Sequence, residues 1–138
     1  MASRKIEDLT PRMQRKIVRF QAELEKAIPG AFRICCTYRS QEEQNELYSH
    51  GRNGDTRPKV TWTTMSVHTS REAVDFYIQR AGKYCDDIKV DTDGDKIEDW
   101  QEFGRVAAMC GLEWGGNWEK KDLPHVQWKD GGSDDGIA

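Results

Sequence analysis

The sequence predicts an α+β fold in a single domain of 138 residues. One observation predicts this class, and a second indicates a folded core. Segments with the apolar spacing of helices mix with short segments of strand character, without the regular rhythm of a parallel βαβ fold. Five Trp, four Tyr and four Phe supply a core, although charged residues make up 33% of the chain. The Gly- and Asp-rich residues 129–138 are expected to form a flexible tail.

The first helix is expected to begin after Thr10, a good N-cap residue, with Pro11 at the first helical position. Pro29-Gly30 is expected to end it. Apolar residues recur between these limits at helical spacing and predict a face turned to the core. They are Met13, Ile17, Phe20, Leu24 and Ile28.

The second helix is expected to follow Ser40, because Ser40 and Glu43 have the spacing of a capping box. Leu47 and Tyr48 are expected to face the interior. The following stretch, 50–58, is rich in turn-forming residues and predicts a surface loop, in which His50 receives no role.

A third helix is expected after the acidic residues 91–95 and before Gly111, a natural C-terminal stop. Its apolar positions are Ile97, Trp100, Phe103, Val106, Ala107 and Cys110. Strands are expected over 32–38, 73–78 and 125–128. In the second of these strands apolar residues alternate toward one side, which leaves Asp75 on the other.

Composition and charge argue against two kinds of partner. A net charge of −3 and a pI near 5.6 do not suit a nucleic-acid binder. No run of about 18 apolar residues is present, so we expect no membrane insertion. Residues 1–8 lack the apolar stretch of a signal peptide, so we expect the chain to start in the cytoplasm.

The four cysteines, Cys35, Cys36, Cys85 and Cys110, include no C-x-x-C pair, which argues against a zinc ribbon. We interpret them as buried, reduced thiols.

Two of the three histidines stand near acidic residues. Asp75 follows His68 by seven positions, and His125 follows Asp122 by three. Two imidazoles and one carboxylate form a typical open zinc site, in which water takes the fourth position. The spacing alone leaves open the alternative that these are ordinary surface or core histidines.

Four motifs together resemble a known family. Residues 66–75 contain Ser-x-His and Ala-x-Asp, and residues 122–125 read Asp-x-Pro-His. The third motif, in residues 37–48, is Thr-Tyr-Arg-Ser with the helix expected after it. The fourth motif, in residues 111–118, is Gly-Leu-Glu-Trp-Gly-Gly-Asn-Trp. Over 33–128 the chain resembles the zinc peptidases that include D-alanyl-D-alanine dipeptidases and carboxypeptidases. Within that family it is most similar to phage L-alanyl-D-glutamate endopeptidases.

The resemblance implies a hedgehog or DD-peptidase-like fold, a small antiparallel sheet flanked by helices with a zinc cleft on the sheet. It implies that His68, Asp75 and His125 bind one zinc ion. It also implies that Asp122 is the general base. Zinc lowers the pKa of its bound water toward about 7. A carboxylate beside that water can then accept its proton.

The resemblance further implies that Arg39 binds substrate and stabilises the developing oxyanion, where a fixed cation acts on the transition state. Trp114 and Trp118 are expected to line the cleft, with Trp114 as a substrate-binding residue. One position departs from the family pattern. Arg71 stands where many relatives have Gly, and Gly permits backbone angles that Arg disfavours. We therefore expect the loop after His68 to differ in shape.

Asp91, Asp93 and Asp95 occupy alternate positions, and Glu102 lies eleven residues after the first. Carboxylates so placed resemble a calcium loop, although Lys96 takes the position that is normally Gly. The alternative is a helix start, with Asp95 as the N-cap residue and Glu98 at the third position.

The function that this resemblance implies is hydrolysis of the L-Ala–D-Glu bond of peptidoglycan stem peptides, by a metalloprotease endolysin that degrades the cell wall. Such an enzyme of a bacteriophage would be bacteriolytic and antimicrobial. It would act as a monomer, stay in the host cytoplasm until a separate holin released it, and then reach the periplasm and cell wall. Two alternatives stay open. One is a D-alanyl-D-alanine carboxypeptidase, disfavoured because that branch resembles Glu-x-x-His near residue 125. The other is a non-catalytic, calcium-dependent cell-wall-binding module.

Overall fold

The computed structural model describes residues 2–61 and 67–130, and the expected tail falls largely outside this part of the chain. Its centre is an antiparallel sheet with the strand order β1-β2-β5-β4, to which β3 adds by pairing with β2. The expected α+β class is therefore confirmed. The strands are β1 Phe32–Cys36, β2 Ala73–Arg80, β3 Lys83–Cys85, β4 Leu112–Trp114 and β5 His125–Trp128.

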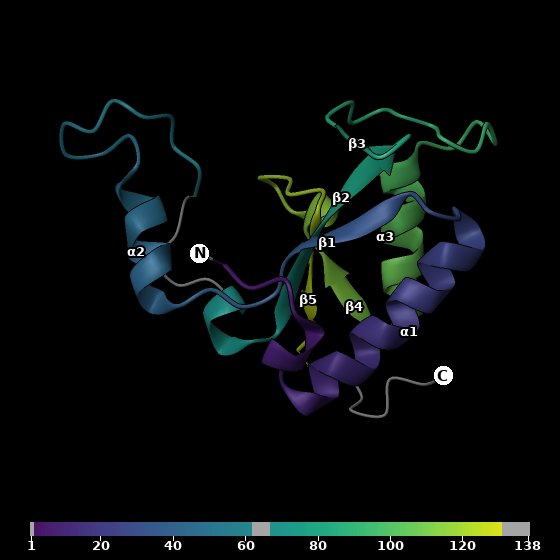
Figure 1. The fold of residues 1–138 in the computed structure, drawn as a ribbon, viewed down its shortest axis with the longest axis horizontal. Coiled ribbons are helices and arrows are strands. Elements are labelled where there is room, and N and C mark those ends of the chain that lie inside the picture. The colour runs from purple at the N-terminus through teal and green to yellow at the C-terminus, as the bar shows by residue number, and fades with distance from the viewer. Residues whose placement is uncertain (1, 62–66, 131–138) are drawn as a thin grey trace.

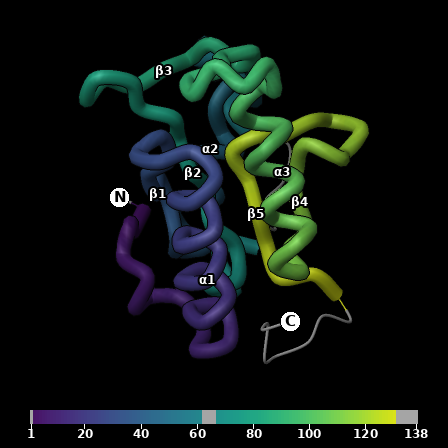
Figure 2. Tube along the Cα trace, turned by 90° about the vertical axis from the view of Figure 1, so that its right-hand side faces the viewer, coloured from purple at the N-terminus to yellow at the C-terminus, as the bar shows by residue number. Residues whose placement is uncertain are grey.

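Two helices, α1 (Pro11–Ala27) and α3 (Asp99–Met109), lie side by side against one face of the sheet (Figures 1 and 2). Helix α2 (Gln41–Ser49) stands apart, beyond the opposite side of the sheet (Figure 1). Three short 3-10 turns complete the elements: η1 (Ile6–Asp8), η2 (Val67–Ser70) and η3 (Gly115–Asn117). None of the described helices is both long and apolar enough to cross a bilayer.

The core lies between the sheet and the pair α1 and α3. The expected stripe of α1 is buried there. Phe76 of β2 packs edge-on against Phe20 of α1 and Phe103 of α3, with ring centroids 5.5 Å apart in each pair. Because side chains alternate along a strand, Val74 and Phe76 face this core and Asp75 points to the other face. The core thus positions an acid on the open side of the sheet.

The N-terminal caps of α1 and α2 agree with the sequence. The Thr10 hydroxyl accepts the Met13 N–H at 3.3 Å, and the Ser40 hydroxyl accepts the Glu43 N–H at 3.1 Å. The Glu43 carboxylate returns the bond by accepting the Ser40 N–H, which completes the capping box.

The inward face of α2 is different from the one expected. Gln44 is its fully buried residue, whereas Leu47 and Tyr48 are only half-buried. Residues 50–58 contain no helix or strand, as the predicted loop requires.

The start of α3 corrects a second expectation. The helix begins at Asp99, with Glu98 in the N-cap position, so Asp95 does not cap it and Glu98 is not its third residue. Ile97 precedes the helix and is about half exposed, at 49%. Gly111 does end the helix, with φ +74°, a conformation that favours glycine.

All four cysteines are free thiols, as expected, but they are not all buried. Cys36 and Cys110 are buried, Cys85 is partly buried and Cys35 is exposed. The pairing of β1 with β2 shifts register between Ile34 and Cys36, so Cys36 pairs with Asp75 and its sulfur lies beside His68.

Candidate metal centre and active-site cleft

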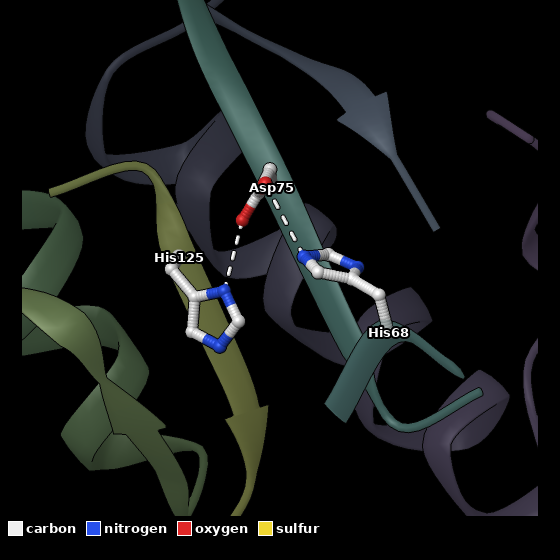
Figure 3. Close-up of side chains that lie close together, drawn as sticks. All are labelled: His68, Asp75 and His125. Carbon is white, nitrogen blue, oxygen red and sulfur yellow. Dashed lines mark hydrogen bonds and ion pairs between the residues drawn. The ribbon is translucent and has the colours of Figure 1, made fainter. Parts of the chain in front are cut away.

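The middle of the sheet brings together the three residues expected to bind metal. Asp75 of β2 lies directly opposite His125 of β5 in the antiparallel ladder, and such pairs have adjacent side chains. His68 belongs to η2, the turn that leads into β2. Figure 3 shows the two imidazoles approaching the Asp75 carboxylate from opposite sides.

The contacts among these side chains are short. Asp75 Oδ2 lies 3.2 Å from His68 Nε2, and Asp75 Oδ1 lies 3.0 Å from His125 Nδ1 (Figure 3). One donor atom from each residue lies within 4.8 Å of the other two. Both imidazoles are buried, with 2% and 5% of their surface exposed. Two nitrogens and one oxygen so placed are the donor set of an open zinc site.

The other nitrogen of each imidazole has its own partner. His68 Nδ1 lies 3.2 Å from the carbonyl oxygen of Thr37, which can only accept, and 3.7 Å from Cys36 Sγ. His125 Nε2 lies 2.8 Å from Gln127 Oε1. These contacts orient the rings, so that Nε2 of His68 and Nδ1 of His125 face the shared carboxylate.

The sequence analysis did not predict that Gln127 contacts His125, although the strand pattern contains a signal for this contact. Gln127 lies two residues after His125 on β5, and residues two apart share one face of a strand. Thr37 acts through its backbone, so its side-chain type carries no signal.

The electrostatics of the cluster also suit a cation. Burial alone would lower the pKa of His68, but its contacts with Asp75 and Cys36 raise that pKa to about 10. Burial opposes ionisation of Asp75, yet His125 and His68 hold its pKa well below the usual range. A proton on His68 therefore balances the Asp75 carboxylate in the metal-free protein. A divalent cation bound here would displace that proton.

The cluster opens into a cleft of about 430 Å³, which Arg39, Trp118 and Asp122 also line. A larger hollow of about 1030 Å³ lies along α2 and shares Arg39, but it contains none of the three metal-binding candidates. The smaller cleft is thus the chemically relevant one.

Asp122 lies beside the donor set without joining it. Its Oδ2 is 4.0 Å from His125 Nδ1, and 49% of its side chain is exposed. Partial desolvation and the charge of Asp75 raise the pKa of Asp122, against the opposing effect of His125, His68 and Arg39. The loop over 115–122 holds it in place, because the Asp122 N–H donates to the Gly115 carbonyl at 2.9 Å. A side chain at position 115 would collide with the Asp122 backbone, so this close approach requires glycine.

Arg39 also lines the cleft. Its guanidinium donates to the buried Gln44 Oε1 at 2.8 Å and lies 3.8 Å from Cys36 Sγ. Gln44 in turn donates to the Thr61 hydroxyl at 3.2 Å. Gln44 therefore holds the arginine in place from behind, a role that the sequence did not predict.

The expected place of Trp114 on the cleft wall is wrong. Trp114 is 7% exposed, belongs to the hydrophobic core and donates its indole N–H to the Leu123 carbonyl at 2.8 Å. Its ring fills a slot between Gly104 and Gly116, where any added side-chain carbon would collide with the indole. Trp118 instead lines the cleft, with its ring centroid 5.1 Å from that of His125.

Arg71 retains a glycine-like backbone, with φ +66°. Its guanidinium stacks 3.9 Å above the Tyr38 ring and donates to the Asp8 carbonyl at 3.0 Å. These contacts offset the strain of a left-handed residue, which is about 1–2 kcal/mol. Ser66, the first residue of the family motif, lies outside the described residues.

Asp91, Asp93 and Asp95 are not part of the cleft. They lie in the loop before α3, at the far end of the sheet from η2 (Figure 1).

The fold and the cleft define a class of protein. An open set of two imidazoles and a carboxylate, with a second carboxylate and a guanidinium beside it, is typical of metallohydrolases. The chain belongs to the M15 peptidases: the family model described as D-alanyl-D-alanine carboxypeptidase matches residues 59–128, which carry His68, Asp75, Asp122 and His125.

Two relatives add detail. The peptidoglycan L-alanyl-D-glutamate endopeptidase CwlK of Bacillus subtilis (strain 168) is 36% identical over 94 residues, which are 65% of this chain and 56% of that protein. The match thus spans about half the length of this curated relative. The crystal structure of the Serratia marcescens L-Ala D-Glu endopeptidase ChiX matches with a TM-score of 0.64 at 23% identity, over 94% of this chain and 89% of that one. This second likeness supports the fold.

Proposed function

We propose that this protein is a zinc-dependent endopeptidase that hydrolyses the L-Ala–D-Glu bond of peptidoglycan stem peptides. The observation that carries the proposal is the convergence of His68, Asp75 and His125 in a cleft that Asp122 and Arg39 also line. Membership of the M15 family supports the reaction class. The names of the two relatives support the bond that is cut.

The residues present fit zinc. Their donors are two imidazole nitrogens and one carboxylate oxygen, and hydrogen bonds already orient both rings. When bound, zinc supplies a Lewis acid that makes water a better nucleophile near neutral pH and polarises a carbonyl. Three protein donors are the number found in open zinc sites, which would accept a water or substrate ligand.

Asp122 is assigned to proton transfer. Its carboxylate faces the cleft next to His125 but outside the donor set, so it is available to a water molecule in the cleft. As general base it takes a proton from the attacking water, and as general acid it returns that proton to the leaving amine. Its backbone turn fixes where the carboxylate can reach.

Arg39 is assigned to substrate binding and charge stabilisation. Gln44 fixes its guanidinium at the cleft wall, so the cation needs little reorganisation when negative charge develops on the substrate. The stem peptide also carries carboxylates, which an arginine can bind with two hydrogen bonds.

A D-alanyl-D-alanine carboxypeptidase is the second candidate, favoured by the description of the matching family model. Digestion of purified peptidoglycan, followed by mass spectrometry, separates the two. Cleavage of L-Ala–D-Glu releases peptides that begin with D-Glu, whereas the carboxypeptidase releases single D-Ala residues. Release of D-Ala alone would contradict our proposal.

Replacement Asp122→Asn tests the mechanism in the same assay. We expect hydrolysis to fall by about 10²–10⁴-fold, because the general base is lost, while bound zinc stays at one per chain. The matched control is Asp130→Asn, which makes the same change at an exposed position away from the cleft. Wild-type turnover in Asp122→Asn would refute the assignment of the base.

We also propose a biological setting, which rests on the sequence resemblance alone. As a phage lysis enzyme, the monomer would stay in the host cytoplasm until a separate holin permeabilised the membrane. Expression with and without a permeabilising protein tests this setting. Culture lysis that occurred equally without that protein would contradict it.

A further inference from the structure

A second group of acidic side chains gathers around the start of α3. We call residues 91–102 the acidic loop. Carboxylates occupy the positions that are numbered 1, 3, 5, 9 and 12 in calcium-binding loops of twelve residues. They are Asp91, Asp93, Asp95, Asp99 and Glu102.

These carboxylates converge in space as well as in sequence. One oxygen each from Asp91, Asp93 and Asp99 lie within 4.8 Å of one another, and the same holds for Asp93, Asp95 and Glu102. Asp93 is common to both sets, so the five side chains surround one region. All five donors are oxygens, in contrast to the nitrogen-rich set at His68 and His125.

Glu102 provides an independent sign that a cation belongs here. It is only 4% exposed, and among the described residues no hydrogen-bond donor reaches its Oε1. The nearest guanidinium nitrogen, from Arg105, lies 3.8 Å from its other oxygen. Burial, together with contact with Asp95 and the charge of Asp93, raises the pKa of Glu102 to about 7. A buried carboxylate that faces other carboxylates is costly unless a cation compensates it.

The backbone of the acidic loop already holds these acids together. The Asp91 carboxylate accepts the N–H groups of Gly94 at 3.0 Å and Lys96 at 2.7 Å. Lys96 has φ +69°, so it takes the left-handed conformation that glycine normally supplies at this position of a calcium loop. Thr92 donates its hydroxyl to Asp99 at 2.6 Å and thereby orients the buried acid. Little rearrangement is needed for a cation to bind.

We propose that the acidic loop binds one Ca²⁺ ion, with Asp91, Asp93, Asp95 and Glu102 as direct ligands and Asp99 beside them. Oxygen donors from flexible carboxylates suit Ca²⁺, which takes six to eight ligands. Mg²⁺ requires a stricter octahedron, and zinc prefers nitrogen and sulfur donors. This site is separate from the proposed catalytic centre and does not depend on the proposed reaction.

Binding would stabilise the start of α3. The ion would remove the repulsion around Glu102 and link the loop to the first turn of the helix. That turn carries Trp100 and Phe103, whose rings pack 5.3 and 5.0 Å from the ring of Phe32 on β1. Ca²⁺ is therefore expected to stabilise the packing of α3 against the sheet.

The experiment uses the full chain with zinc bound and calcium removed by a calcium-selective chelator. CaCl₂ is titrated in a calorimeter, and thermal unfolding is followed with and without CaCl₂ or MgCl₂. We expect one binding site, a higher melting temperature with Ca²⁺, and a smaller shift with the same concentration of Mg²⁺.

Replacement Glu102→Gln is the decisive variant, because it keeps the shape of the side chain and removes its charge. We expect Ca²⁺ to bind it on the order of 100-fold more weakly. Without Ca²⁺ the variant should unfold at the same temperature as the wild type or at a higher one, because the substitution removes a buried charge that no cation compensates. The matched control Glu98→Gln lies in the same loop but outside the cluster, and it should bind Ca²⁺ like the wild type.

Three results would overturn the proposal. They are no Ca²⁺ binding by the wild type, unchanged binding by Glu102→Gln, and equal weakening by Glu98→Gln. The last would indicate only a diffuse attraction to acidic surface. If Glu102→Gln does not fold, Asp93→Asn at an exposed position gives the same test of binding.

Discussion

The metal centre of the cleft and the acidic loop gather ligands for cations in opposite ways. At the centre, one carboxylate lies between two imidazoles, and a proton on His68 balances its charge when no metal is bound. In the acidic loop, five carboxylates meet, and the Arg105 guanidinium reaches only the outer oxygen of Glu102, at 3.8 Å. The first arrangement is electrically satisfied without metal, whereas the second accumulates repulsion that only a proton or a cation relieves.

The two sites also differ in which part of the fold holds their ligands in place. The centre stands on paired strands in the middle of the sheet, so the ladder itself fixes Asp75 opposite His125. The acidic loop depends on hydrogen bonds from its own backbone and on one buried acid of α3. We therefore expect the centre to control chemistry with little effect on stability, and the loop to control stability.

The largest expected effect separates the two sites directly. In His125→Ala, zinc content should fall from one per chain to nearly zero, and hydrolysis should fall by at least about 10³-fold. Its response to Ca²⁺ in thermal unfolding should persist, because the loop shares no ligand with the cleft. Elemental analysis and the melting curve measure both. The control His50→Ala changes the histidine outside the cleft and should retain both metals. Loss of the Ca²⁺ response in His125→Ala would show that the two sites are coupled.

A variant with an intermediate expected effect tests whether the hydrogen bond from Gln127 is needed to orient His125, or whether strand pairing is enough. Gln127→Ala removes the partner of His125 Nε2. We expect zinc affinity to fall by about 10–100-fold, the usual effect of losing such a partner. Competition with a coloured zinc chelator measures the change, with Gln101→Ala on the exposed side of α3 as control. Unchanged affinity would show that pairing within the sheet is sufficient.

The smallest expected effect is a pH dependence of the acidic loop. The pKa of Glu102, about 7 in the folded protein, lies above its ordinary value of 4.5 because of burial and of Asp95 and Asp93, with Arg105 opposing. The folded state therefore holds a proton that the unfolded state releases, and unfolding free energy falls as pH rises from about 5 to 7.5. The loss should be on the order of 2 kcal/mol without Ca²⁺.

Urea denaturation across this pH range measures the slope. It should be absent from Glu102→Gln and from the wild type saturated with Ca²⁺. Equal slopes in the calcium-free wild type and Glu102→Gln would assign the pH dependence to other groups.

Sequence patterns within single helices and strands predicted much of this structure. The Thr10 and Ser40 caps, the stripe of α1 and the outward position of Asp75 all follow from spacing along one element, and the structure has each of them. The family resemblance selected the three metal-binding candidates that the sheet brings together. Both kinds of signal lie within short stretches of sequence.

What the sequence did not predict depends on contacts between distant segments. Strands β3 and β4 have three residues each, too short for an alternating pattern. Trp114 could be placed in the core only by knowing that Gly104 and Gly116 leave a slot for its ring. Gln44 looks like a surface residue of a helix until Arg39 and Thr61 are seen to bind it.

The placement of α2, apart from the packed core, has a consequence for how this cleft evolves. Its two walls have different origins: the metal-binding candidates come from the sheet and the turn before it, whereas Arg39, Leu47, Val60 and Thr61 come from the segment around α2. Helix α2 itself makes no extensive contact with another helix or strand among the described residues. Apart from Arg39 and the buried Gln44, substitutions in this segment are therefore expected to cost little folding stability. They would reshape one wall of the cleft and leave the three metal-binding candidates in place.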